Sequence, residues 1–166
     1  MHHNQGLERL VLDFREILRN EFRDNLISMV LYGSAVRGTW GKESDVDVCL
    51  IFQEMPHSRY KRNKILFPTL QKLREKKSYQ ELRGKGFLAE VVPIVFTKEE
   101  IDQTRPIFLD MVDTSEIIVD DGTFDRKLQQ IKMRMRELGS KKIFTEDGHW
   151  FWVLKPDLKL GEVFAL

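Results

Sequence analysis

The sequence predicts an α/β domain, because helical and strand-like apolar patterns alternate along its 166 residues. Strand-like apolar runs cover residues 26–32, 45–52, 87–96 and 116–119. Amphipathic helical patterns cover residues 5–24, 58–83, 105–114 and 123–138, with shorter helices opening at residues 34 and 97. Pro68 is expected to kink or restart the second of these helices, and residues 97–100 have the capping-box pattern of a helix start. Repeats and low-complexity linkers are absent from the sequence, so we expect one domain over residues 1–166, with its core in 5–140 and an aromatic tail in 141–166.

Composition excludes several classes of protein. The chain is 42% apolar and 32% charged with a formal net charge of +1, so no global field indicates nucleic acid or a membrane surface, and only local patches could bind nucleic acid. The single cysteine, Cys49, excludes an internal disulfide framework and fits a reducing compartment. No apolar run reaches transmembrane length, and the first residues do not form a signal peptide. We therefore expect a cytoplasmic protein that does not use a membrane.

The first candidate site residues lie where an apolar run ends abruptly. Residues 30–32 are followed directly by Gly33 and Ser34. Glycine allows the backbone to approach a ligand closely, and a helix that opens at Ser34 directs free N–H groups at an anion. This turn therefore predicts a phosphate-binding site.

A pair of acids follows twelve residues beyond Gly33. Asp45 and Asp47 enter the second strand-like run, and strand periodicity places both carboxylates on one face. Neighbouring acids on a half-buried strand repel each other, so they are favourable mainly when cations lie between them. A phosphate-binding turn with paired carboxylates indicates metal-assisted phosphoryl or nucleotidyl transfer. The alternative without a function is a turn with two solvent-facing aspartates.

These motifs together resemble the signature of the DNA polymerase β-like nucleotidyltransferase superfamily: Gly33-Ser34, then Arg37-Gly38, then Ser44-Asp45-x-Asp47 on a strand. Among its branches, the chain is most similar to the short minimal nucleotidyltransferases. The resemblance implies a small mixed sheet with helices packed mainly on one face. It also implies transfer of a nucleoside monophosphate, expected to be AMP, from an NTP such as ATP to an acceptor hydroxyl, with one or two Mg²⁺ ions and release of pyrophosphate.

The resemblance assigns roles to the motif residues. Gly33 and Ser34 would hold the β and γ phosphates, and Asp45 and Asp47 would hold Mg²⁺. Arg37 would neutralise phosphate charge, although packing against an acid is an alternative for a guanidinium.

Two further residues complete the expected site. The superfamily implies a third carboxylate on a later strand, and Glu90 in the run 87–96 fits that position as metal ligand or base. The alternative for Glu90 is a rim glutamate that points to water. Ser44 is assigned to the nucleotide site, where it more plausibly fixes the loop than touches the substrate.

The acceptor is left open by the sequence. Minimal nucleotidyltransferases commonly pair with small helical HEPN-domain toxins and act as antitoxins that place AMP on them, which is the first expectation for a partner. The alternatives are a small-molecule acceptor such as an aminoglycoside, an RNA end, or a non-catalytic binding protein with a vestigial site. The absence of an obvious acceptor domain weakens the first two.

Two other features have both a functional and a structural interpretation. Residues 59–77 contain eight basic residues and one acidic residue, Glu75. This excess of positive charge indicates either a patch for triphosphate, RNA or an acidic partner, or a solvated helix face. In the tail, Trp150 and Trp152 could stack a nucleobase, but docking of the tail on the core or on a partner is the favoured interpretation.

Overall fold

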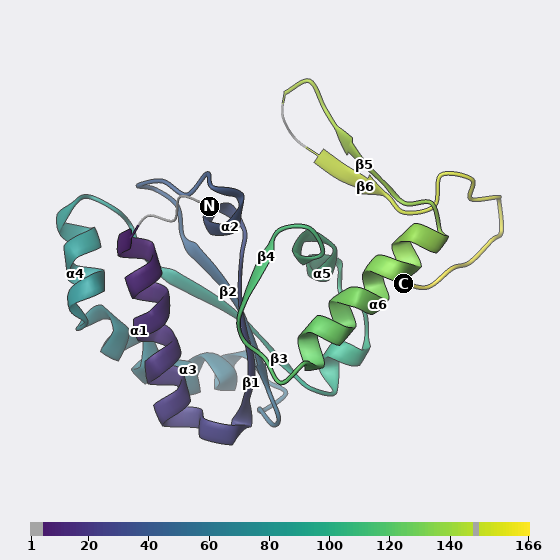
Figure 1. Cartoon of the computed structure of the whole chain (residues 1–166). Helices are drawn as coiled ribbons and strands as arrows, with labels where there is room; N and C mark the ends of the chain where they lie inside the picture. The colour runs from purple at the N-terminus through teal and green to yellow at the C-terminus, as the bar shows by residue number, and fades with distance from the viewer. Residues whose placement is uncertain (1–4, 148–149) are drawn as a thin grey trace.

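The computed structural model describes residues 5–147 and 150–166, and its centre is a four-stranded sheet (Figure 1). The strands are β1 (Leu26–Tyr32), β2 (Val46–Phe52), β3 (Val91–Thr97) and β4 (Ser115–Val119), and they lie in the order β3-β2-β1-β4. Strand β1 is antiparallel to both β2 and β4, whereas β2 and β3 are parallel. The predicted mixed α/β fold is therefore confirmed.

Helices cover both faces of this sheet (Figure 1). The larger layer contains α1 (Gln5–Phe22), α3 (Arg59–Arg74) and α4 (Lys77–Gly84), and α5 (Pro106–Met111) and α6 (Thr123–Glu137) form a smaller layer opposite. Alternation along β2 serves both layers, because Val48 and Leu50 join the α1 core while Cys49 and Ile51 join the α5–α6 core. Short elements complete the body: α2 (Ser34–Arg37) and two 3₁₀ turns, Arg23–Asn25 and Glu100–Asp102.

Two predicted boundaries were wrong. A kink or restart was expected at Pro68; helix α3 continues through Pro68 to Arg74, so it does not restart there, and the break before α4 falls at residues 75–76. Proline removes one backbone hydrogen bond, and the buried stripe around it, with Leu66 and Leu73 almost fully enclosed, holds the helix together. The third strand begins at Val91 rather than at residue 87, because the buried Ala89 has a left-handed backbone with φ of 52°.

The tail contains a hairpin that the sequence did not predict. Strands β5 (Lys141–Phe144) and β6 (Trp150–Val153) pair antiparallel and project from the body beside α5 and α6 (Figure 1). The Nζ atom of Lys142 lies 4.1 Å from the ring centroid of Trp150 and 3.7 Å from a carboxylate oxygen of Asp113. Trp152 packs against the α5–α6 core.

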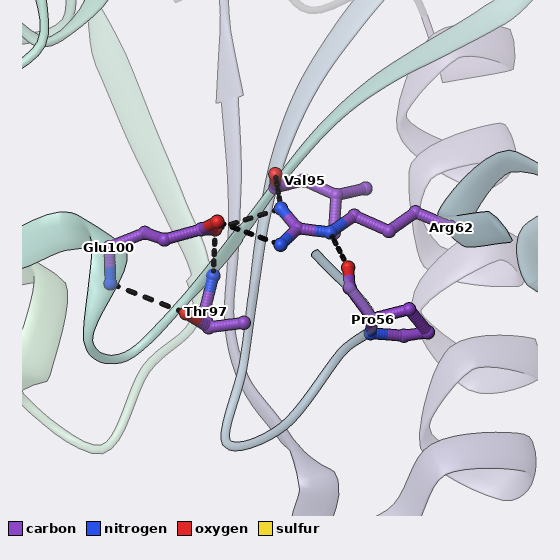
Figure 2. Close-up of polar contacts among 5 residues, drawn as sticks. All are labelled: Pro56, Arg62, Val95, Thr97 and Glu100. Atoms are coloured by element: carbon purple, nitrogen blue, oxygen red, sulfur yellow. Dashed lines mark hydrogen bonds and ion pairs between the residues drawn. The ribbon is translucent and has the colours of Figure 1, made fainter. Parts of the chain in front are cut away.

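An ion pair between the buried Arg62 and the half-buried Glu100 joins α3 to the turn that follows β3 (Figure 2). The Arg62 guanidinium donates two hydrogen bonds of 2.8 Å to the Glu100 carboxylate, and it also donates to the carbonyls of Val95 and Pro56. Glu100 in turn accepts from the Thr97 N–H, while the Glu100 N–H donates to the Thr97 hydroxyl. The predicted capping box at Thr97 is thus present, although it opens a 3₁₀ turn rather than a helix.

None of the helices in the described ranges is long and apolar enough to cross a membrane.

Candidate functional site

The site is built around the close approach of Gly33 to Asp47. Gly33 follows β1 with φ of 72°, a conformation that side chains rarely adopt. A Cβ atom at Gly33 would lie 2.3 Å from Oδ2 and 3.1 Å from Cγ of Asp47, so a larger residue would collide with the carboxylate. The glycine therefore brings the end of β1 directly against the acid on β2.

Directly after this glycine, α2 turns the chain away from the sheet. It is a single turn in which the Arg37 N–H donates to the Gly33 carbonyl and the Thr39 N–H donates to the Ser34 carbonyl, each at 3.1 Å. The first N–H groups of any helix have no acceptor within that helix. Because α2 has one turn, its dipole is small, so a phosphate bound here would depend on individual N–H groups and on the Ser34 hydroxyl.

The two aspartates differ in exposure. Asp45 is exposed at the start of β2, and Asp47 is half-buried one residue inside the strand. Burial raises the pKa of Asp47, the negative charge of Asp45 raises it further, and the Arg37 guanidinium partly offsets both effects. The acids therefore interact unfavourably with each other, as the sequence predicted.

Tyr32 and Asp110, which the sequence did not single out, act electrostatically on the groups around Asp47 and Arg37. Burial raises the pKa of Tyr32 to about 12, and the nearby negative charges of Asp47 and Asp110 add to the effect. Asp110 comes from α5, where burial raises its pKa and the charges of Lys142 and Arg37 oppose this. The only signal in the sequence was one acid among the inward-facing apolar residues of the helix 105–114.

The Glu90 carboxylate is bound elsewhere. Its backbone carbonyl accepts a 2.8 Å hydrogen bond from the Val46 N–H, next to Asp45, but its side chain accepts from Tyr79 Oη at 2.6 Å and Arg74 Nη2 at 2.8 Å. Burial acts to raise the pKa of Glu90, and these hydrogen bonds outweigh it and hold the pKa below its ordinary value. The role of Glu90 as third ligand stays a prediction, and the structure shows it paired with α3 and α4.

Ser44 closes the loop between α2 and β2. Its hydroxyl accepts from the Gly41 N–H and its own N–H donates to the Gly41 carbonyl, both at 3.1 Å. Trp40 from the same loop stacks on Phe87 with ring centroids 4.9 Å apart. These contacts hold the segment that leads into the aspartate pair, which fits the loop-fixing role expected for Ser44.

The donor set suits Mg²⁺ that is shared with a substrate. Mg²⁺ is usually held by one or two carboxylates together with substrate phosphates, rather than by a complete protein cage. Asp45 and Asp47 supply two neighbouring carboxylates whose repulsion a cation would relieve. Within residues 5–147 and 150–166, no group of three or more His, Cys, Asp or Glu is placed to hold a metal ion.

Comparison with known proteins identifies the family. A family model described as a nucleotidyltransferase domain matches residues 12–125, which is more than half of the chain and contains both the glycine turn and the acid pair. The chain therefore belongs to the nucleotidyltransferase domain family, in agreement with the resemblance seen in its motifs.

Two curated relatives come from Methanocaldococcus jannaschii and carry the name "putative protein adenylyltransferase". One is 38% identical over 60 residues, 36% of this chain and 41% of the relative, and the other is 34% identical over 53 residues, 32% of this chain and 54% of the relative. The matches thus span about half the length of these relatives.

Solved structures support the same fold at low identity. A toxin–antitoxin crystallised with AMP-PNP has a TM-score of 0.50 at 16% identity, over 77% of this chain and 89% of that one. The spectinomycin adenyltransferase AAD(9) from Enterococcus faecialis, crystallised with ATP and spectinomycin, has a TM-score of 0.53 at 14% identity, over 79% of this chain and 66% of that one.

Proposed function

We propose that this protein is a Mg²⁺-dependent nucleotidyltransferase that transfers AMP from ATP to a hydroxyl group of a partner protein, with release of pyrophosphate. The observation that carries the proposal is the contact between Gly33 and Asp47, which places a phosphate-binding turn and an acid pair at one point. Membership of the nucleotidyltransferase domain family supports it.

In this proposal the residues of the turn bind the triphosphate. The N–H groups of the first turn of α2 and the Ser34 hydroxyl donate hydrogen bonds to the β and γ phosphates. Because Gly33 has no side chain, these phosphates can approach the backbone closely. Arg37, whose charge acts on both Asp47 and Asp110, neutralises phosphate charge. Ser44 contributes indirectly, because it holds the loop that carries Asp45.

The aspartates hold the metal. Asp45 and Asp47 are the proposed carboxylate ligands, and bound Mg²⁺ supplies stabilisation of the charge that develops on the transferred phosphoryl group. Glu90 remains the proposed third ligand or base. In that role its carboxylate has to give up the hydrogen bonds from Tyr79 and Arg74 and turn toward the metal site. Loss of a metal ligand should remove most of the rate, because the metal is lost with it.

The acceptor is inferred from the names of related proteins. Two relatives carry a protein adenylyltransferase name, and a structure of similar fold is a toxin–antitoxin with AMP-PNP. We therefore take a protein partner, a HEPN-domain toxin in the first instance, as the acceptor of AMP in the cytoplasm. A small-molecule acceptor is the second candidate, favoured by the likeness to a spectinomycin adenyltransferase.

Calorimetry of ATP binding with and without Mg²⁺ tests the site. The native chain should bind ATP in a Mg²⁺-dependent manner, and the double variant Asp45→Asn, Asp47→Asn should lose that dependence. Transfer of radiolabelled AMP to the partner should fall by about 10³-fold or more. Glu43→Gln, an exposed acid in the same loop, is the matched control and should change neither quantity. Unchanged binding in a folded double variant would support the non-catalytic alternative.

A second variant addresses Glu90. If its carboxylate serves the metal, Glu90→Gln should reduce transfer by about 10²-fold with little change in stability. If its role is to hold Arg74 and Tyr79, Glu90→Gln should lower stability, and transfer by the folded fraction should be retained.

A further inference from the structure

The outward face of α3 carries a stripe of four residues that has the spacing of a helix-packing seam. Tyr60, Lys64, Phe67 and Gln71 follow each other at intervals of four, three and four residues, on the side opposite the buried stripe that contains Leu66 and Leu73. The Tyr60 and Phe67 side chains are 76% and 57% exposed and lie about 10 Å apart along the helix axis. Apolar rings at this spacing are typical of a face that packs against another helix.

The charges around this stripe are unusual for a solvated helix. Helix α3 contains no acidic residue. Three of its cations have internal carboxylate partners, since Arg62 pairs with Glu100, Lys72 with Glu21 and Arg74 with Glu90.

The other three cations of α3 are different. Arg59, Lys61 and Lys64 are exposed and form no ion pair with any residue of the described ranges. Arg59 and Lys61 lie in the first turn of the helix, where the macrodipole makes cations unfavourable, and Lys64 follows in the second turn. A negative partner would relieve both the dipole effect and the mutual repulsion of these charges.

Charge separates the possible occupants of this face. A second copy of the chain would place the cations of one α3 against those of the other, which is unfavourable because neither helix offers an acid. Three unpaired cations would neutralise only about three phosphates, which gives weak and strongly salt-dependent binding to nucleic acid. Beside the stripe, a cavity of about 230 Å³ lies between α3 and β3, lined by Arg59, Arg62, Asn63 and residues 93–96, and it has the size to receive a side chain of a packed helix.

We propose that the stripe Tyr60, Lys64, Phe67 and Gln71 is the docking face for an amphipathic helix of a partner protein, with acidic residues that flank the apolar seam of that helix. The face is separate from the proposed chemistry, because α3 follows the C-terminal end of β2 whereas Asp45 and Asp47 lie at its N-terminal end. The proposal thus holds whether or not the site transfers AMP.

Binding of designed peptides to the full chain tests this proposal. The probe is a fluorescent helical peptide with leucine at seam positions and glutamate beside them, and the comparison peptide has lysine in place of glutamate. We expect the acidic peptide to bind and the basic peptide not to bind. The double variant Tyr60→Ser, Phe67→Ser and the single variant Lys64→Glu should each weaken binding of the acidic peptide at least tenfold.

Matched controls come from other exposed positions of the chain. Met133→Ser on α6, where the side chain is 55% exposed, and Lys85→Glu after α4 should leave peptide binding unchanged. All variants should keep the thermal stability and the Mg²⁺–ATP binding of the native chain, so failure of the docking face is distinguishable from failure of the nucleotide site.

Four results would overturn the proposal. They are absence of binding by the acidic peptide, equal binding by the basic peptide, and equal loss in the control variants. The fourth is that the stripe variants abolish self-association of the chain, or its binding to single-stranded oligouridylate, while peptide binding is unaffected.

Discussion

The half-buried charges near the two ends of β2 differ in whether the protein compensates them. Beyond its C-terminal end, Arg62 and Glu100 neutralise each other, and backbone groups of Pro56, Val95 and Thr97 complete their hydrogen bonding (Figure 2). At its N-terminal end, Asp45 and Asp47 repel each other, and the pKa of Asp47 is raised. The pKa of Glu100 is lowered, chiefly by the hydrogen bonds from Arg62.

This difference distinguishes a structural charge from a functional one. A buried charge whose partners are all supplied by the protein contributes to the folded state and has nothing left to offer a ligand. A pair of acids that the protein leaves uncompensated lowers stability until a cation arrives, so it is expected where a ligand completes the site. The same criterion separates Arg62 from Arg59, Lys61 and Lys64 on the same helix, which form no ion pair within the part of the chain that the structure describes.

The largest effect is expected from removing the Arg62–Glu100 ion pair near the C-terminal end of β2. Arg62→Ala should lower the free energy of unfolding by about 3 kcal/mol, because it leaves the Glu100 carboxylate and two backbone carbonyls without their donor. Chemical denaturation measures this loss. Lys64→Ala on the outer face of the same helix is the control and should change stability by less than about 0.5 kcal/mol. A loss below about 1 kcal/mol for Arg62→Ala would contradict the assigned role.

A smaller effect is expected from adding a side chain at Gly33, next to the aspartate pair at the N-terminal end of β2. Gly33→Ala should cost about 1–2 kcal/mol for the left-handed backbone, and it should also weaken Mg²⁺–ATP binding because the new Cβ displaces Asp47. Gly38→Ala is the control for ATP affinity, since Gly38 also has a positive φ, of 76°, but a Cβ there would meet nothing within 4 Å; its ψ of 14° differs from the −146° of Gly33, so the two stability losses need not be equal. Equal effects of both variants on ATP affinity would show that the contact with Asp47 is irrelevant to binding.

The smallest effect concerns how the free energy of unfolding depends on pH, measured by denaturation in metal-free buffer. Its sign should differ between variants at the two ends of β2. The folded pKa of Glu100 is lowered, so this group stabilises the protein above the unfolded pKa of about 4.3 and loses its contribution as pH falls through the folded value. Glu100→Gln should therefore be less stable than the native chain at pH 7, and the difference should shrink in acid.

Asp47 should behave in the opposite way. Its folded pKa is raised, so the ionised group destabilises the protein above that pKa, and the effect disappears as pH falls below the unfolded value of about 3.9. Asp47→Asn should therefore be more stable than the native chain at pH 7 while it loses Mg²⁺–ATP binding. Equal signs for Glu100→Gln and Asp47→Asn would contradict the distinction between the two ends.

Much of the site was predictable because its signals are local. The period of two in residues 45–52 predicted β2 and its acid pair, and the abrupt end of the run at Gly33 predicted the turn that the structure shows. The capping box at Thr97 was predicted from four consecutive residues, 97–100. The hairpin of the tail was missed because both of its faces carry apolar residues, so strand alternation is hidden.

The remaining features depend on which helices pack together. The sequence alone determined the glycine turn and the shared strand face of the two acids, since these are properties of backbone conformation over a few residues, whereas pairing of β1 with β2 brought Gly33 against Asp47. Only the tertiary structure decided that Glu90 pairs with Arg74 and Tyr79 and that Asp110 of α5 joins Tyr32 and Arg37. The reason is physical: a carboxylate is stabilised by whichever cation or donor the folded chain brings within hydrogen-bonding range, and packing between distant segments settles that choice.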